Sequence, residues 1–341
     1  MELRKDPITR SWVLTGDMDP ALSASHPCLY CAGNEKLTPA PIYSLPFGSR
    51  PGAVRVFPHP RPLYRIEGNA ERRAERIYDK MRTVGAHEII VENPDHHSRL
   101  STADERDIAC LLSCWAVRID DLKKDIRFKY ITVFKNQGKV AGQELTHPHS
   151  ELTGTPFIPR RILYELRASQ EYYGRKERCV FCDIERQEEQ QGLRVVDISG
   201  NFLALCPFAS RVPYELWIIP RYHHSSFESD LLHRTDASEL AGILRRCLAR
   251  LEQVTDAYHL VLHTSPNTNV RSEVPGYWST IADDYHWHIE IVPIAKNETK
   301  SYSIKEAYYC PTTPETAAAH LRDLPANREA VPQQRLEFLH E

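Results

Sequence analysis

The 341-residue sequence predicts an α+β fold made of two tandem modules, each an antiparallel sheet with one helix packed on it. The first observation behind this prediction is an internal repeat, in which one series of motifs occurs once in each half of the chain. The second is hydrophobic periodicity, because short β-branched runs bounded by turn residues alternate with longer stretches at helical spacing. Together these observations indicate a duplicated unit of strands and one main helix.

The repeated series is a Cys-x-x-Cys pair, a strand that runs into His-His-Ser, a helix, a further strand and a His-x-His-x-Glu motif. Its members are "CLYC" (28–31), "HEIIVENPDHHS" (87–98) and "HPHSE" (147–151) in the first half, and "CVFC" (179–182), "YELWIIPRYHHS" (214–225) and "HWHIE" (286–290) in the second. Matches of single motifs are frequent by chance, whereas a matched series is not. We therefore expect a first module over 1–155, a connecting helix over 156–178 and a second module over 179–341.

Local patterns justify the individual elements. The runs "HEIIVE", "KYITVF", "ELWII" and "HLVL" are short, apolar and β-branched, and are typical of strands. Apolar residues recur at helical spacing over 101–127, with Ser101 as the expected N-cap, and over 238–256. Further helices are expected over 159–176, where the two halves are connected, and over 313–324, near the C-terminus.

Composition excludes several classes of protein. A net charge of −3 and a sequence pI of about 6.6 give no basic footprint for nucleic acid or for a membrane surface. The N-terminus lacks the apolar core of a signal peptide, and no apolar run approaches the ~20 residues of a membrane span. We therefore expect a cytoplasmic protein without disulfides. Five of the nine cysteines lie in apolar surroundings and are expected in the core: Cys110, Cys114, Cys206, Cys247 and Cys310.

The two Cys-x-x-Cys pairs indicate metal binding, since thiolates and imidazoles are the usual ligands of structural zinc. One expected ligand set is Cys28, Cys31, His96 (or His97) and His147, and the other is Cys179, Cys182, His223 (or His224) and His286. Two pairs of buried thiols in turns are the alternative. The recurrence of the same four parts favours metal, one or two ions per chain.

On an extended strand His147, His149 and Glu151 would share one face, because residues two apart point to the same side. If a metal holds His147, it also fixes the strand and thereby the orientation of His149, as a nucleophilic or acid–base histidine requires. The alternative for His149 is a hydrogen-bonded core histidine.

Several segments resemble the galactose-1-phosphate uridylyltransferase family of the histidine triad superfamily. They are "RKDPITRSWVL" (4–14), "ENPDHHS" (92–98), "FKNQGKVAGQELTHPHSEL" (134–152), "LALCPFASRVPYELWIIP" (203–220) and "YHWHIEIVP" (285–293). The resemblance implies two histidine-triad modules, usually assembled as a homodimer. It implies ping-pong transfer of a nucleoside monophosphate from a nucleoside diphosphate sugar to a sugar 1-phosphate.

Site residues carried over from this resemblance are His149 as the nucleophile, Cys28, Cys31, His96 and His147 as zinc ligands, and Asn136, Gly138 and Gly142 near the phosphates. In the second half the resemblance implies a metal on Glu165, His263, His286 and His288, whereas the internal repeat indicates Cys179, Cys182, His223 and His286. We favour the second set, with zinc, or iron as the alternative.

The phosphate site departs from the family pattern. Glu151 stands where the family has Gln, Glu144 where it has Ser, and His59 where it has Asn; Asp17 and Asp19 replace an arginine-bearing stretch. A carboxylate beside a phosphate repels it unless a proton, cation or metal compensates the charge. We expect Glu151 to act with His149, and Arg55 and Glu144 to line the substrate site; pairing of Glu151 with Arg55 would relieve the repulsion.

Three functions are compatible with these residues. The first is a nucleotidyltransferase, or a nucleotide-sugar phosphorylase, that uses His149. The second is a metal-dependent enzyme of changed chemistry that uses the two His-x-His-x-Glu motifs, since two histidines and a carboxylate can form an open metal site. The third is a relative that keeps fold and metal but has lost catalysis. We rank them in this order.

Overall fold

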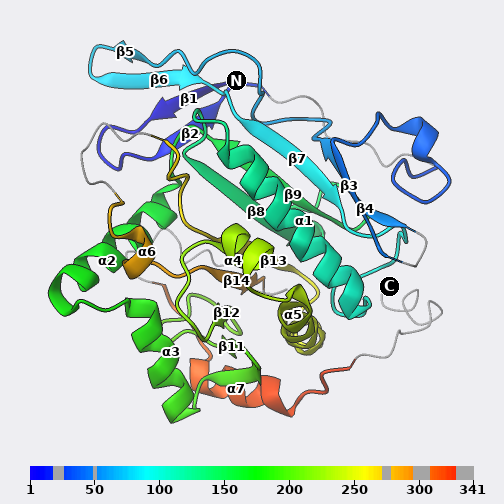
Figure 1. Ribbon diagram of the computed structural model, residues 1–341, viewed down its shortest axis with the longest axis vertical. Helices are drawn as coiled ribbons and strands as arrows, with labels where there is room; N and C mark the ends of the chain where they lie inside the picture. Colours follow the sequence, from blue (N-terminus) through cyan, green and yellow to red (C-terminus); the bar gives the residue numbers. More distant parts are fainter. Residues whose placement is uncertain (18–26, 49–51, 271–277, 295–307, 328–341) are drawn as a thin grey trace.

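A computed structural model describes residues 1–17, 27–48, 52–270, 278–294 and 308–327 (Figure 1). Its centre is one ten-stranded antiparallel sheet to which each half of the chain contributes five strands. The first half provides β3 (Tyr43–Pro46), β4 (Ala53–Pro58), β7 (Ala86–Val91), β8 (Tyr130–Gln137) and β9 (His149–Thr155). The second provides β10 (Val195–Ser199), β11 (Phe202–Leu205), β12 (Leu216–Pro220), β13 (Tyr258–His263) and β14 (His288–Pro293). The α+β prediction is confirmed.

The strand order shows the internal repeat directly. From the centre outward the first half runs β8-β9-β7-β4-β3 and the second runs β13-β14-β12-β11-β10. The two halves meet where β8 pairs with β13, with Leu260 opposite Lys135. The sequence indicated two sheets but not that they would join edge to edge. Joining them removes one exposed edge from each half.

One face of the sheet is covered by α1 (Glu105–Lys123), α4 (Phe227–His233), α5 (Ala237–Leu251) and α7 (Pro314–Asp323). Helix α1 packs against α4 and α5, and in Figure 1 it crosses in front of β8 and β9. A single apolar cluster joins both halves under these helices; it includes Leu111 and Trp115 of α1 and Leu244 and Leu248 of α5. The helical spacing of apolar residues over 101–127 and over 238–256 is therefore explained by the burial of these residues in this shared core.

The expected start of α1 is wrong. Asp104, not Ser101, is the N-cap, and its carboxylate accepts from the backbone N–H of Arg106 at 2.9 Å. Ser101 lies in a turn before the helix and donates instead to Glu252 at 2.6 Å. The expected helices over 159–176 and 313–324 correspond to α2 (Arg160–Lys176) and α7.

On the opposite face of the second half lie α2, α3 (Val180–Gln191) and the short α6 (Ile281–Asp284). A second apolar cluster lies beneath them and includes Ile162, Phe181, Leu203, Ile219 and Tyr285. Alternation along β11 and β12 sends Leu203 and Ile219 to this cluster and Ala204 and Ile218 to the other core. The second half of the sheet is thus buried on both faces.

A separate four-stranded sheet, which the sequence did not indicate, contains β1 (Glu2–Lys5), β2 (Trp12–Thr15), β5 (Arg73–Glu75) and β6 (Tyr78–Arg82) in the order β2-β1-β6-β5. Leu3, Met81 and Tyr64 form its small core. Two 3-10 helices, η1 (Glu35–Leu37) and η2 (Lys139–Ala141), complete the described elements. Within the described ranges no helix has the length and apolar character needed to cross a bilayer.

Candidate functional site

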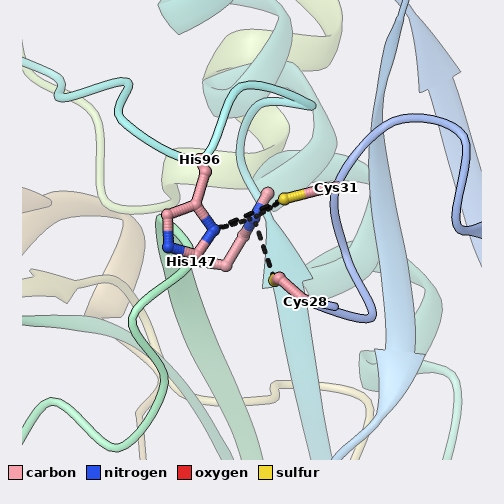
Figure 2. Close-up of side chains that lie close together, drawn as sticks. All are labelled: Cys28, Cys31, His96 and His147. Carbon is pink, nitrogen blue, oxygen red and sulfur yellow. Dashed lines mark hydrogen bonds between the residues drawn. The ribbon is translucent and has the colours of Figure 1, made fainter. Parts of the chain in front are cut away.

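Four side chains of the first half converge in the way that the sequence predicts for a metal site (Figure 2). Cys28 and Cys31 come from the turn before η1, His96 from the loop after β7, and His147 from the residues before β9. The Nδ1 atoms of His96 and His147 lie 3.4 Å apart, and Sγ of Cys31 lies 3.4 Å and 3.7 Å from them. Sγ of Cys28 lies 3.7 Å from Nδ1 of His147.

These distances fit a tetrahedral zinc ion. Ligands at usual zinc bond lengths lie about 3.4 Å apart for two nitrogens and about 3.6 Å apart for nitrogen and sulfur. The other ring nitrogen of His147, Nε2, lies 2.7 Å from the carbonyl oxygen of Asn93, which leaves Nδ1 as the lone-pair donor. Of the two histidines that the sequence left open, His96 joins the group and His97 does not.

The HPH segment is arranged differently from the continuous strand that we expected. β9 begins at His149, and His147 precedes it. The carbonyl oxygen of Pro148 accepts from the backbone N–H of Glu92 at 3.2 Å, which holds the segment beside the end of β7. Consequently His147 turns into the cysteine cluster, whereas His149 belongs to no ligand group among the described residues.

Alternation along β9 determines where His149 points. Ser150 accepts a 3.0 Å hydrogen bond from the indole of Trp115 in α1, and Leu152 lies in the core beneath that helix. His149 and Glu151 therefore face the side of the sheet away from α1. His149 is 3% exposed, so it is almost completely buried in this structure.

One ring nitrogen of His149 is available as a nucleophile. Nδ1 lies 2.8 Å from the carbonyl oxygen of His147 and must carry the proton, because a carbonyl only accepts. Nε2 then bears the lone pair. Burial and next the positive charge of Lys135 lower the pKa of His149, which favours the neutral ring. Lys135 is itself buried, and it donates to Glu92 at 2.9 Å and to the carbonyl oxygen of His149 at 3.0 Å.

Glu151 is held by two histidines that the sequence did not assign to it. Its Oε2 atom lies 2.9 Å from Nε2 of His87 and 3.8 Å from Nε2 of His59, and the two imidazoles stack 4.0 Å apart. Burial would raise the pKa of Glu151, but the hydrogen bond and charge of His87 and the charges of His59 and His149 lower it overall. Burial and the neighbouring His87 lower the pKa of His59 to about 4.

The pairing with Arg55, which was one possible way to relieve the repulsion at Glu151, is not present among the described contacts. Arg55 donates to the carbonyl oxygen of Tyr30 and lies over the ring of Phe57, so it supports the turn that carries the cysteines. Glu144 pairs with Arg61. Neither the contact of Arg55 with Tyr30 nor that of Arg61 with Glu144 could be predicted from local sequence patterns, because the two partners are far apart in the sequence.

The expected phosphate loop lies between β8 and β9. Gly138 and Gly142 flank η2 with φ of 87° and 83°, which glycine adopts without strain. Asn136 lies on β8, and its Oδ1 is 2.8 Å from Nδ1 of His259 on β13. Asp17 is exposed, and Asp19 lies outside the described residues.

The second half repeats the cysteine cluster. Cys179 caps α3, Cys182 lies in its first turn, and both join His223 and His286. Sγ of Cys182 lies 3.3 Å from Nδ1 of His223 and 3.6 Å from Nδ1 of His286. His223 rather than His224 therefore belongs to this group, whose donors also fit zinc.

The resemblance-based set in the second half is divided by the structure. His286 turns to the cysteines, while Glu165, His263 and His288 gather with Glu290, which the sequence did not include. Glu290 binds Arg161 at 2.6 Å and Arg211 at 2.8 Å. Of the five cysteines expected in the core, Cys114, Cys206 and Cys247 are buried. Cys110, which lies in α1 beside the edge strand β3, and Cys310, which precedes α7, are only partly buried.

Comparisons with known proteins agree with this architecture. The sequence profile described as "Galactose-1-phosphate uridyl transferase, N-terminal domain" matches residues 54–159. The chain is 28% identical to ADP-glucose phosphorylase of Arabidopsis thaliana, over 95% of this chain and 93% of that one. It is 27% identical to galactose-1-phosphate uridylyltransferase of Thermotoga maritima, over 95% and 98%.

Solved structures give the same result over the full length of the fold. A uridylyltransferase structure superposes with a TM-score of 0.76 at 29% identity, covering 94% of this chain and 97% of that one. ADP-glucose phosphorylase from Arabidopsis thaliana with bound ADP-glucose gives 0.73 at 27% identity, covering 95% and 99%. The chain is thus similar, over almost its whole length, to galactose-1-phosphate uridylyltransferase and to ADP-glucose phosphorylase, and its residues 54–159 match the galactose-1-phosphate uridyl transferase N-terminal domain.

Proposed function

We propose that the protein is a nucleotidyltransferase that moves a nucleoside monophosphate between sugar 1-phosphates through a covalent nucleotidyl-histidine. The observation that carries this proposal is the state of His149: its Nδ1–H is committed to the carbonyl oxygen of His147, so Nε2 presents a lone pair. Imidazole is a competent nucleophile near neutral pH and also a good leaving group from phosphorus. Its relatives in Thermotoga maritima and Arabidopsis thaliana support the same reaction class.

In the first half-reaction, Nε2 of His149 attacks the α-phosphorus of a nucleoside diphosphate sugar. The bond from that phosphorus to the bridging oxygen breaks, and a sugar 1-phosphate leaves. The hydrogen bond to the carbonyl oxygen of His147 stabilises the positive charge that the ring gains. In the second half-reaction, a phosphate oxygen of another sugar 1-phosphate attacks the same phosphorus, and the imidazole leaves.

We assign a structural zinc to Cys28, Cys31, His96 and His147, and a second one to Cys179, Cys182, His223 and His286. The sulfur and nitrogen donors, at the separations given above, support zinc over iron in both. A bound zinc would crosslink loops that are far apart in the sequence. His147 would then be fixed at the residue whose carbonyl orients His149.

The second candidate is a nucleotide-sugar phosphorylase, in which inorganic phosphate is the acceptor. The similarity to ADP-glucose phosphorylase favours it. Both candidates share the first half-reaction and differ only in what removes the nucleotide from His149. A single metal on the first His-x-His-x-Glu motif is not supported, since His147 lies with the cysteines, Glu151 lies with His59 and His87, and His149 belongs to no ligand group among the described residues. The homodimer, the two-module boundaries and the cytoplasmic location stay predictions.

The test is the mass of the intact protein after incubation with UDP-glucose, UDP-galactose or ADP-glucose in the absence of acceptor. We expect a gain of one nucleoside monophosphate in the wild type and none in His149→Ala. Adding galactose 1-phosphate, glucose 1-phosphate or inorganic phosphate should remove the label, and the most effective acceptor distinguishes transferase from phosphorylase. Absence of label with every donor would contradict the proposal.

A further inference from the structure

Glu151 presents one free carboxylate oxygen to the nucleophile. Oε1 lies 3.9 Å from Nε2 of His149, and the Glu151 side chain is 10% exposed, against 3% for His149. Oε2 is occupied by His87. Among the described residues, Oε1 has no hydrogen bond, and no lysine or arginine lies within ion-pair distance of the carboxylate. A phosphoryl group on Nε2 would therefore meet an uncompensated oxygen.

The two histidines beside Glu151 are hydrogen-bond donors and not metal ligands. Nδ1 of His87 accepts from the backbone N–H of Leu63 at 3.0 Å, and Nδ1 of His59 accepts from that of Arg61 at 3.1 Å. Both rings therefore carry their proton on Nε2, the atom that faces Glu151. To bind a metal through Nε2, each ring would have to move its proton to Nδ1, against a backbone N–H. The stacked rings thus fix an ionised carboxylate.

Glu290 is the residue of the second half that corresponds to Glu151 in the internal repeat, and its carboxylate is neutralised by arginines. Nε2 of His288 lies 3.9 Å from Oε1 of Glu290, the same separation as between His149 and Glu151. There, Arg161 binds Oε1 of Glu290 and Arg211 binds Oε2. Both oxygens of Glu290 have arginine partners, whereas among the described residues Glu151 has only histidines as neighbours, His87 and His59 beside Oε2 and His149 3.9 Å from Oε1. Among the described residues, no lysine or arginine neutralises Glu151 in the way that Arg161 and Arg211 neutralise Glu290.

We propose that Glu151 binds a divalent cation, Mg²⁺ or Mn²⁺, together with the phosphates of the nucleotide sugar. The site rests on the proposed function, because the substrate supplies its remaining ligands. Mg²⁺ is usually bound by one or two carboxylates plus substrate phosphates and water, and does not need a cage made of protein alone. The cation bridges Oε1 and a phosphate oxygen, so it converts repulsion into attraction. The true substrate is then the metal complex of the nucleotide sugar.

The experiment compares the wild type with Glu151→Gln in chelator-free buffer with and without added MgCl₂, with the zinc content measured in each sample. The readout is the initial rate of label transfer from UDP-glucose or ADP-glucose to the protein at subsaturating donor. We expect Mg²⁺ to raise the wild-type rate by about tenfold or more, because a close charge repulsion is removed. Glu151→Gln should react without Mg²⁺ and gain nothing from it. Glu75→Gln makes the same chemical change on exposed β5 and should behave as the wild type.

A second readout does not require turnover. Electron paramagnetic resonance should detect Mn²⁺ bound to His149→Ala in the presence of nucleotide sugar, and lose that signal in the His149→Ala, Glu151→Gln double variant. Wild-type labelling that is equal with and without Mg²⁺ would overturn the cation site and leave the proposed function intact. Equal Mg²⁺ dependence of wild type and Glu151→Gln would overturn it too. If no protein is labelled, the proposed function fails, and Glu151-dependent Mn²⁺ binding alone supports or rejects the cation site.

Discussion

Nδ1 of His149 lies 2.8 Å from the carbonyl oxygen of His147, whose own ring belongs to the cysteine cluster. One residue thus connects the proposed metal site to the proposed nucleophile: its side chain is available for an ion, and its backbone fixes the tautomer of the imidazole of His149. The second half keeps the same pair in a looser form, since Nδ1 of His288 lies 3.3 Å from the carbonyl oxygen of His286.

Removing a thiolate from the first cluster should affect chemistry as well as stability. We expect Cys31→Ser to lose one zinc per chain and most of its nucleotide labelling, because His147 would no longer be held. The matched change, Cys182→Ser, should lose the other zinc but keep labelling, since His149 depends on the first cluster. Elemental analysis and intact mass measure both effects. Equal labelling of the two variants would contradict the link from His147 to His149.

The buried ion pair between Lys123 of α1 and Glu228 of α4 joins the two halves. Lys123 donates to Glu228 and, at 2.8 Å, to the carbonyl oxygen of Ser265. Lys123→Met leaves Glu228 buried without a cation and should lower the free energy of unfolding by about 3–5 kcal/mol. Urea unfolding followed by fluorescence measures this loss. A loss below about 1 kcal/mol, the value of an exposed pair, would show that the pair is not buried.

The same pair predicts a pH dependence. Burial raises the pKa of Glu228, but the charge and hydrogen bond of Lys123 lower it overall, below the ordinary value of 4.5. Its contribution is therefore present above that value and is lost as the pH falls through the lowered pKa. Without Lys123 the effect of burial is no longer opposed by a cation, so the pKa of Glu228 rises and protonation relieves the buried charge at higher pH. The difference in unfolding free energy between wild type and Lys123→Met should therefore shrink from pH 7.5 to pH 5; a constant difference would contradict this.

The loop after β8 depends on glycine at position 138. With φ 87° and ψ 151°, Gly138 occupies a region open essentially to glycine alone, and an added Cβ would lie 3.1 Å from the carbonyl oxygen of Asp256. Gly138→Ala should cost about 1–3 kcal/mol. Gly142→Ala, where a Cβ would meet nothing within 4 Å, should cost about 1 kcal/mol from its left-handed φ alone. Thermal unfolding of both variants checks the order, and a smaller loss at 138 than at 142 would contradict it.

Local patterns were sufficient for much of the fold. The repeat predicted two equivalent halves, and the structure gives them the same strand order. Both sets of four candidate metal ligands could be predicted from the sequence. Each set contains a Cys-x-x-Cys pair, and the same order of cysteine and histidine motifs occurs in both halves of the chain. The joining of the halves through β8 and β13 was not predictable, since nothing local specifies which sheet edges pair.

The surroundings of Glu151 were also beyond sequence reasoning. His87 begins the run "HEIIVE", which predicts a strand but not a partner for this histidine. Its contact with Glu151 follows from the register of β7 against β9, where Ile89 is opposite Glu151. His59 was noted only as a replacement for Asn. Its stacking on His87 requires the pairing of β4 with β7. The partners of a buried carboxylate depend on such long-range pairing.

The most direct test of the central claim is to locate the nucleotide on the chain. The protein is incubated with a nucleotide sugar, digested under mildly alkaline conditions that preserve phosphoramidates, and sequenced by tandem mass spectrometry. We predict one nucleoside monophosphate on His149, in the peptide that contains residues 147–151, and none on His288. Label on His288 or on any other side chain, or a label that persists in His149→Ala, would contradict the account.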